Sequence, residues 1–303
     1  MVRFFYIYTK KVITILKLFI KAALWLFCAE INTKNKYLLN TRGPLLIIAN
    51  HPNSFLDAII IGSRYNRRIH FLARGDVFTK RHHRFLLKLL NMIPVYRLRE
   101  GKEFLHLNEY AFLESARLLK NKEAVLIFIE GTCLNTNTLQ PFKKGTTRIL
   151  QACHAEQEFP QIHLAGISYN NFKGIGKRVN LCLDVFPTAS AIIDAKDSVN
   201  FNNNVFSKLA ALILPTAHTP TIKKNALYYF NLPFYNLVYS FVDKKTRGTV
   251  FFDSVLFGVL FFLYPLYLMC VISLLLFISI PQPIIFVTLV LLFLLRNQTL
   301  SIS

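Results

Sequence analysis

The apolar residues in the middle of the chain fall into short continuous runs, and amphipathic stretches separate these runs. A run of this length, bounded by turn residues, is typical of a strand that is buried on both faces. We therefore predict strands at Leu45–Ala49, Ile69–Ala73, Ala124–Ile129, Ile162–Ser168 and Val179–Phe186, helices at Lys80–Leu90, Glu103–Leu119 and Thr146–Ala152, and a loop at Asn200–Asn204. The alternation predicts an α/β domain in which a central mixed sheet is flanked by helices.

The first 28 residues show the periodicity of a helix with a narrow polar stripe. The stripe consists of Arg3, Lys10, Thr14, Lys17 and Lys21, and most other positions are apolar. Lysines interrupt the apolar run and no small-residue cleavage site follows, which argues against a signal peptide. The wide apolar arc favours an interfacial helix on anionic lipid over a core helix of a soluble domain.

The other end of the chain predicts a membrane hairpin. No formal charge occurs from Ser254 to Leu295, and Pro281-Gln282-Pro283 interrupts this segment. The first limb, Ser254–Ile280, is long enough to span the hydrocarbon, whereas the second, Ile284–Leu295, is marginal, so the hairpin either spans or re-enters the membrane. Basic residues flank it at Lys244, Lys245, Arg247 and Arg296. By the positive-inside tendency, both ends face the cytoplasm.

These patterns divide the chain into four parts. Residues 1–36 hold the N-terminal amphipathic helix and residues 37–225 the α/β domain. Residues 226–250 form an interfacial segment rich in aromatic and basic residues, and residues 251–303 form the hairpin. The expected architecture is thus an α/β domain between an interfacial helix and a membrane hairpin.

Composition and charge narrow the class of protein. The chain has 303 residues, 53% of them hydrophobic, with 28 phenylalanines, which is too apolar for a wholly soluble protein. The net charge of +20 is spread among apolar segments and matches no nucleic-acid reader, so we exclude nucleic acid as the main partner. Anionic phospholipid and phosphate-bearing substrates suffice as partners for this charge. The five cysteines have no metal-ligand spacing, and we expect them to be reduced and no metal to be bound.

Candidate chemistry lies just beyond the first predicted strand, where His51 is followed by Asp57. A neutral imidazole can take the proton of a hydroxyl, and a carboxylate can fix its tautomer. Ser54-Phe55-Leu56-Asp57 reads equally as a capping box that opens a helix, and His51 as a turn residue. Gly174-Ile175-Gly176-Lys177 lacks the spacing of a phosphate-binding loop.

Five segments, in order, resemble the PlsC-like family of glycerophospholipid acyltransferases, which includes the lysophosphatidate and glycerol-3-phosphate acyltransferases. Asn50-His51 with Asp57 resembles the first motif, Ile93-Pro94-Val95-Tyr96-Arg97 the second and Phe128-Ile129-Glu130-Gly131-Thr132 the third. Pro141-Phe142-Lys143-Lys144-Gly145 resembles the segment that trails the third motif, and Leu164-Ala165-Gly166-Ile167-Ser168 stands where the fourth is expected.

The chain departs from the family pattern at several positions. Five residues instead of four separate His51 from Asp57, and Pro52 is the expected extra residue, which a turn before the helix can absorb. Ile129 replaces a proline, Cys133 follows Gly-Thr where arginine or serine is common, and the fourth motif lacks its proline. Cys133 is a second candidate, as an acyl-accepting thiol, but the sequence supplies it no base.

The resemblance implies a membrane-bound enzyme that moves a fatty acyl group from acyl-CoA or an acyl carrier protein to a hydroxyl of a lysolipid or glycerol phosphate acceptor, with no cofactor. It implies His51 as general base, Asp57 as its orienting partner, and an acceptor site made of Asn50, Arg97, Glu130, Gly131, Thr132 and Lys143, with Arg97 on the acceptor phosphate. The implied location is the inner membrane, with the catalytic domain on its cytoplasmic side. Two alternatives stay open: an acceptor without phosphate, such as an amine or another lysolipid, and an inactive membrane-binding relative.

Overall fold

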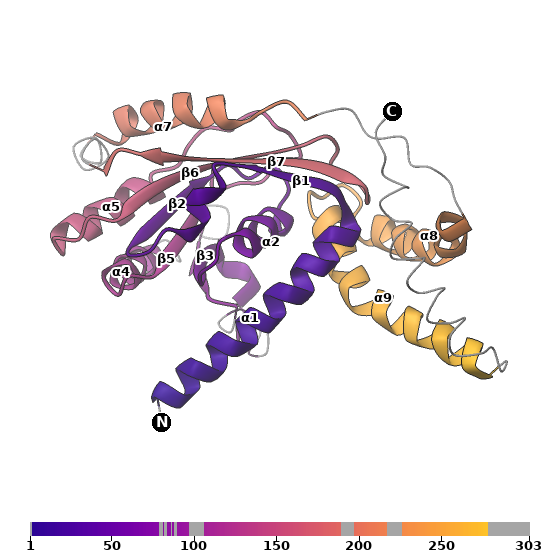
Figure 1. Ribbon diagram of the computed structural model, residues 1–303. Coiled ribbons are helices and arrows are strands. Elements are labelled where there is room, and N and C mark those ends of the chain that lie inside the picture. The colour runs from indigo at the N-terminus through magenta and orange to yellow at the C-terminus, as the bar shows by residue number, and fades with distance from the viewer. Residues whose placement is uncertain are drawn as a thin grey trace.

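The computed structural model describes residues 2–78, 81, 84–85, 87, 90–96, 106–188, 197–216 and 226–277. Its centre is a sheet of seven strands in the order β1-β7-β6-β2-β5-β3-β4 (Figure 1). The strands are β1 (Cys28–Lys34), β2 (Leu45–Ala49), β3 (Ile69–Arg74), β4 (Met92–Val95), β5 (Ala124–Phe128), β6 (Gln161–Tyr169) and β7 (Lys177–Phe186). The predicted fold class, α/β with a mixed sheet, is confirmed.

The sheet is parallel from β6 to β4, whereas β7 runs antiparallel to β6, and β1 runs parallel to β7. The last residue of β2, Ala49, is in register with Phe128 of β5 and Ala165 of β6. Because parallel strands end at the same edge, the segments that follow β2 and β5 emerge side by side. This register brings the first and third motifs together.

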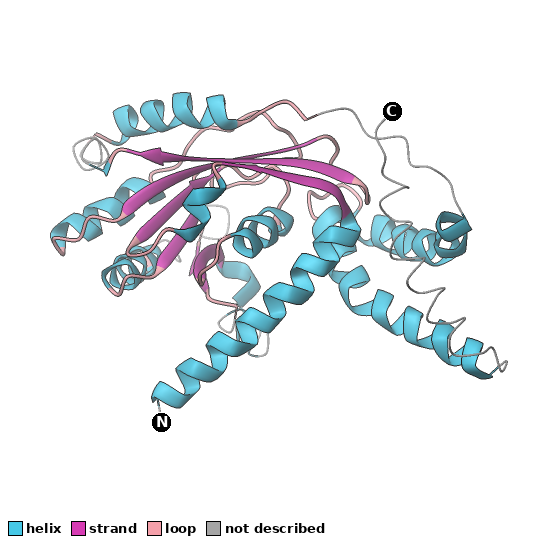
Figure 2. Cartoon of the chain, in the orientation of Figure 1, coloured by secondary structure: helices cyan, strands magenta, loops and turns pink. Residues whose placement is uncertain are grey.

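Helices cover both faces of the sheet (Figure 2). They are α1 (Val2–Phe27), α2 (Phe55–Arg64), α4 (Leu107–Lys120), α5 (Gly145–Ala155), α7 (Ser198–Leu212), α8 (Ala226–Thr246) and α9 (Phe252–Phe277), with short 3-10 turns η1 (Lys36–Asn40) and η2 (Gly75–Phe78). Alternate side chains of β2 serve two cores, because successive strand residues point to opposite faces. Leu45 and Ile47 pack with α1, α2, α8 and α9, whereas Leu46 and Ile48 pack with α4, α5 and α7.

The five predicted strands are all present, and β1 and β4 are additional strands at the two edges of the sheet. The predicted helices at Glu103–Leu119 and Thr146–Ala152 correspond to α4 and α5, although residues 103–105 lie outside the described residues. The helix predicted at Lys80–Leu90 falls mostly outside them too.

The loop predicted at Asn200–Asn204 is wrong, because these residues lie within α7. Phe201, Val205 and Leu209 follow the helical repeat and are fully buried against the sheet. Asp197 caps the helix, since its side chain accepts hydrogen bonds from the backbone N–H groups of Val199 and Asn200. Burial of one apolar stripe therefore outweighs the low helix propensity of the asparagines.

Helix α1 exposes apolar side chains, and the lysines of its polar stripe differ in their surroundings. Leu18 and Phe19 are each 63% exposed. Lys17, expected to face lipid, instead donates hydrogen bonds to the carbonyl oxygens of Tyr65 and Arg67, and burial lowers its pKa to about 8. Lys21 is exposed. The lysine stripe therefore serves partly to dock the helix on the α/β domain.

Helix α9 is long and apolar enough, at Phe252–Leu274, to cross a membrane, and 11% of its most apolar window is buried. A core helix of a soluble protein is mostly buried, so this exposure is unusual. Helix α8 packs beside α9 and exposes Tyr229, Phe230, Leu237 and Phe241. The second limb of the predicted hairpin, Ile284–Leu295, lies outside the described residues.

Candidate active site

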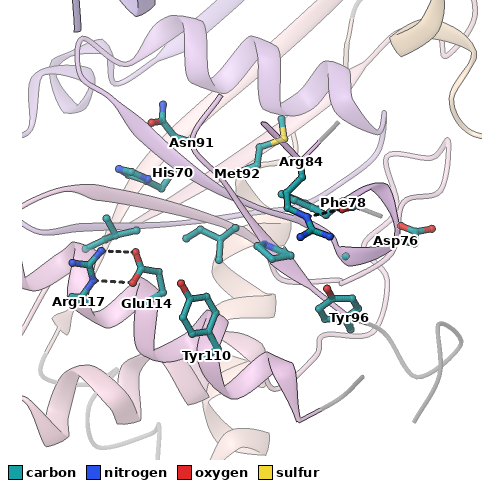
Figure 3. Close-up of a pocket in the computed structure, with 14 residues that line it drawn as sticks. His70, Asp76, Phe78, Arg84, Asn91, Met92, Tyr96, Tyr110, Glu114 and Arg117 are labelled. Atoms are coloured by element: carbon teal, nitrogen blue, oxygen red, sulfur yellow. Dashed lines mark hydrogen bonds and ion pairs between the residues drawn. The ribbon is translucent and has the colours of Figure 1, made fainter. Parts of the chain in front are cut away.

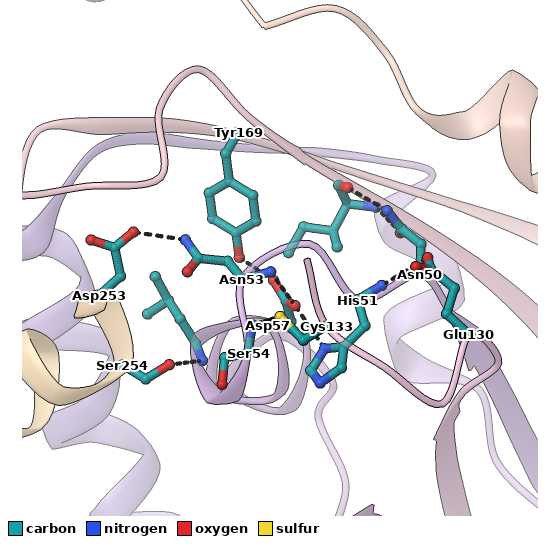
Figure 4. Close-up of polar contacts among 12 residues, drawn as sticks. Asn50, His51, Asn53, Ser54, Asp57, Glu130, Cys133, Tyr169, Asp253 and Ser254 are labelled. Atoms are coloured by element: carbon teal, nitrogen blue, oxygen red, sulfur yellow. Dashed lines mark hydrogen bonds and ion pairs between the residues drawn. The ribbon is translucent and has the colours of Figure 1, made fainter. Parts of the chain in front are cut away.

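The first motif forms the turn that follows β2 and the first residues of α2, and we call residues 50–57 the catalytic turn. His51 Nδ1 lies 2.9 Å from Asp57 Oδ2 (Figure 4). A carboxylate oxygen accepts, so the Nδ1–H donates and the lone pair of Nε2 is left on the side away from Asp57. The ring is partly accessible, at 19% exposure. A base with this geometry can take a proton from a hydroxyl.

The residue added to the family spacing is absorbed before the helix. Helix α2 begins at Phe55, and Ser54 takes a φ of 52°, a left-handed value that closes the turn. This strained conformation lets the chain reverse between His51 and Asp57 despite the extra residue. The longer spacing is therefore compatible with the dyad.

Asp57 is fully buried and held by two further donors. The backbone N–H of Asn53 lies 2.8 Å from Oδ2, and the Tyr169 hydroxyl lies 2.6 Å from Oδ1. Burial, with the nearby Asp57 charge, raises the pKa of Tyr169 well above its usual range, so the hydroxyl keeps its proton and donates it to the bond. Sequence reasoning missed Tyr169, which ends β6 directly after the expected fourth motif.

The capping box predicted from Ser54 and Asp57 is not formed. In the described structure Ser54 gives α2 no side-chain cap, and Asp57 reaches back to the N–H of Asn53 rather than to that of Ser54, which a capping box would engage. One carboxylate thus closes the turn and orients His51. The two roles are not alternatives here.

Residues of the third motif hold the other side of His51. Its ring stacks on Phe128, with centroids 3.8 Å apart, and its backbone N–H donates to Glu130 Oε1 at 3.1 Å. Glu130 is 3% exposed, and burial raises its pKa to about 7, against the effect of hydrogen bonds from the backbone of His51 and Gln140. Glu130 therefore fixes the backbone of His51.

Asn50 is 2% exposed and has a structural role in the turn. Its Nδ2 donates to the carbonyl of Ile167 at 2.9 Å, and its Oδ1 accepts from the Ile167 N–H at 2.8 Å. This bidentate contact ties the end of β2 to β6. Both ends of the Asn50 amide thus have partners within the protein. Asn50 therefore supports the expected acceptor site by holding the turn in place.

The loop after β5 carries the remaining third-motif residues. Gly131 has a φ of 62°, and a Cβ built on it would lie 2.9 Å from Lys143 Cγ, so the position suits glycine for two reasons. Thr132 is half-buried and Lys143 is exposed. The Lys143 N–H donates to the Ile129 carbonyl at 2.9 Å, which folds the trailing segment back onto the motif.

Cys133 lies beside the turn but is not an activated nucleophile. Its Sγ accepts a hydrogen bond from the Ser54 N–H at 2.9 Å. Burial, and secondarily the Asp57 charge, raises the pKa of its thiol to about 12. A thiol in this state is not a thiolate at neutral pH. Among the residues described, no group of three or more His, Cys, Asp or Glu side chains is arranged to hold a metal ion.

The second motif ends at Arg97, which lies outside the described residues. The preceding residue, Tyr96, is clamped by Asn108 of α4, whose side chain bonds both its N–H and its carbonyl at 2.7 Å. Tyr96 also borders a cavity of about 850 Å³ lined by side chains of β3, β4 and α4, including His70, Tyr110 and Arg117 (Figure 3). None of the described members of the predicted site lines this cavity.

Comparison with known proteins agrees with this arrangement. The model of the family described as acyltransferase matches residues 30–169, which contain all of the motifs above. Among solved structures, the fold resembles that of PlsC from Thermotoga maritima, described as a 1-acyl-sn-glycerophosphate (LPA) acyltransferase, with a TM-score of 0.51 and 18% identity over 69% of this chain and 83% of that one. No curated protein sequence matches the chain. Residues 30–169 thus match the acyltransferase family, and the fold that carries them resembles that of PlsC.

Proposed function

We propose that the protein is an O-acyltransferase in which His51 is the general base. The observation that carries this proposal is the 2.9 Å contact between His51 Nδ1 and Asp57 Oδ2. Nε2 takes the proton of an acceptor hydroxyl while the hydroxyl oxygen attacks the thioester carbonyl of acyl-CoA or an acyl carrier protein. The tetrahedral intermediate then collapses to an ester, and the imidazolium returns the proton to the departing thiolate. No covalent acyl-enzyme is required.

The proposed acceptor is a lysolipid or glycerol phosphate. Support comes from the relative PlsC, described as acting on 1-acyl-sn-glycerophosphate, and from the net charge of +20. Arg97 would bind the acceptor phosphate, because a guanidinium can bind phosphate oxygens bidentately. Glu130, Gly131, Thr132 and Lys143 would line the approach to His51. An intact dyad favours an active enzyme over an inactive relative.

The proposed location is a membrane, with the catalytic domain on the cytoplasmic side. The apolar exposure of α1, α8 and α9 supports attachment to a bilayer that contains anionic phospholipid. The acceptor and its acylated product are membrane lipids under this proposal. A catalytic site attached to the membrane through these helices would bind the acceptor and release the product directly within the bilayer.

The test is acyl transfer by the full-length protein purified in detergent. Radiolabelled acyl-CoA or acyl carrier protein is offered with glycerol-3-phosphate, lysophosphatidate, or a lysophospholipid or amine without a free phosphate monoester. We expect one labelled ester, formed on a phosphate-bearing acceptor. Transfer confined to an acceptor without phosphate would remove the proposed role of Arg97, and no transfer to any acceptor would favour the inactive relative.

A further inference from the structure

The first turn of the apolar helix α9 contacts the catalytic turn directly. Asn53 Nδ2 donates to Asp253 Oδ2 at 2.9 Å, and the Leu56 N–H donates to Ser254 Oγ at 3.1 Å (Figure 4). Two hundred residues separate Asn53 from Asp253 in the sequence. Both contacts fall between His51 and Asp57, within the segment that sets the geometry of the dyad.

Asp253 is itself anchored to the sheet. Its Oδ2 lies 2.5 Å from Lys177 Nζ, and its Oδ1 accepts from the Gly174 N–H at 2.9 Å. Lys177 also donates to the backbone and side-chain oxygens of Asn171. The side chains of Asp253 and Lys177 are both fully buried. The segment from Gly174 to Lys177, which lacks the spacing of a phosphate-binding loop, thus binds the Asp253 carboxylate through the Gly174 N–H and the Lys177 ammonium group.

A gain in folding stability is a weak explanation for the buried ion pair between Asp253 and Lys177. Removing two charges from water is costly, and apolar residues of similar size often replace a buried ion pair with no loss of stability. The pair here additionally holds the side chain of Asn53, and the neighbouring Ser254 supplies α2 with the N-terminal hydrogen bond that Ser54 does not. Because a base displaced by about 1 Å can cost on the order of 100-fold in rate, a restraint on this turn matters for catalysis.

We propose that Asp253, paired with Lys177 and assisted by Ser254, is a positioning residue that holds the catalytic turn in its reactive geometry. The proposal rests on the function proposed above. Since Asp253 and Ser254 lie in the first turn of the apolar helix α9, the position of that helix bears directly on the dyad. Activity is then coupled to the helix that is suited to cross the membrane.

The test uses the full-length protein in detergent with the variant Asp253→Ala/Lys177→Met, which removes both charges together and leaves neither buried alone. We expect kcat to fall about 10- to 100-fold, while the KM values for donor and acceptor change less than about threefold. The matched control is Glu156→Gln/Lys120→Met, which breaks the exposed ion pair between Lys120 and Glu156 at 2.6 Å. Unchanged kcat in the folded variant, or an equal fall in the control, would overturn the proposal.

A milder pair of variants decides the matter if the double variant does not fold. Ser254→Ala removes the hydroxyl that Leu56 contacts, and Ser254→Thr keeps it. We expect Ser254→Ala to lower kcat about threefold or more and Ser254→Thr to restore it. Equal rates for both variants and the wild type would overturn the proposal.

A readout without substrate separates this proposal from the proposed function. The Nδ1 proton of His51 is observed by NMR on protein labelled with ¹⁵N-histidine and is assigned by its absence from His51→Gln. We expect the signal to move or broaden in Asp253→Ala/Lys177→Met, or in Ser254→Ala, and not in the control. Absence of acyl transfer by the wild type would reject the enzyme, whereas an unmoved signal would reject the positioning role.

Discussion

The Tyr169 hydroxyl donates a 2.6 Å hydrogen bond to Asp57 Oδ1, which joins the end of β6 to the first turn of α2. With the Asn53 N–H and His51 on Oδ2, both oxygens of this buried carboxylate are engaged. Asp57 is thereby fixed in position before any substrate arrives. Such preorganisation is what a general base needs in its partner.

Tyr169→Phe should therefore impair catalysis as well as stability. The variant leaves one Asp57 oxygen without its donor, so we expect kcat to fall about tenfold and stability to fall by about 1–3 kcal/mol. Tyr37→Phe is the control, because Tyr37 is 71% exposed. Steady-state kinetics and urea unfolding measure the two effects. An unchanged kcat would mean that His51 and Asn53 alone suffice to hold Asp57.

Glu130→Gln should change the pH dependence of stability. Burial raises the pKa of Glu130 from 4.5 to about 7, so the folded protein binds more protons than the unfolded chain between these values. Wild-type stability should accordingly fall, relative to the variant, as pH rises from 4.5 to 7, by at most about 3 kcal/mol. Glutamine keeps an oxygen that can accept from the His51 N–H.

Urea midpoints at pH 5 and pH 7.5 measure this difference. The exposed Glu109, in the first turn of α4, provides the matched control Glu109→Gln. We expect the stability difference between wild type and Glu130→Gln to change with pH, and that between wild type and Glu109→Gln to change much less. The same pH response for both variants would show that Glu130 titrates as a solvated carboxyl.

Gly131→Ala should be costlier than a substitution at a glycine with a similar backbone. Both Gly131 and Gly43 have positive φ, at 62° and 83°, but a Cβ meets Lys143 at the first and nothing within 4 Å at the second. We expect Gly43→Ala to cost about 1 kcal/mol and Gly131→Ala more, with loss of activity. Adding Lys143→Ala should recover the steric part. Equal costs at the two glycines would exclude the contact with Lys143.

Leu18→Glu/Phe19→Glu should weaken membrane attachment by placing charges on the exposed apolar side of α1. Co-sedimentation with vesicles of mixed neutral and anionic lipid measures the effect. If the protein truncated before α9 remains folded, the variants are compared in that protein. If it does not, they are compared in the full chain. Tyr110→Glu is the control, since Tyr110 is 64% exposed on α4. If α1 does not touch lipid, the α1 variant will sediment with vesicles as the control does.

The sequence predicts the central strands because each is an apolar run buried on both faces, as Leu45–Ala49 shows. The edge strand β1 escaped prediction, since its sequence, CAEINTK, alternates between buried and exposed positions and is largely polar. β4 is short and contains Pro94, which is unfavourable within a sheet except at an edge. In α7 the asparagines led to the prediction of a loop, although Phe201, Val205 and Leu209 form an apolar stripe at helical spacing.

In the candidate site, too, the sequence predicts contacts between neighbouring residues but not contacts between distant ones. His51 and Asp57 are close in the sequence, so their pairing is visible in a short motif and survives an extra residue in the turn. Tyr169 and Asp253 reach the turn from 112 and 200 residues away, and their contacts depend on strand order and helix docking. A single sequence carries no local signal for such partners.

The central claim is that His51 is the general base, and the direct measurement is kcat of His51→Gln on the acceptor that the wild type acylates. Loss of a general base predicts a fall of about 10²- to 10⁴-fold, with the melting temperature and vesicle binding close to those of the wild type. His154→Gln, at an exposed position near the end of α5, serves as control and should retain wild-type kcat. A folded His51→Gln protein with near wild-type kcat would contradict the account.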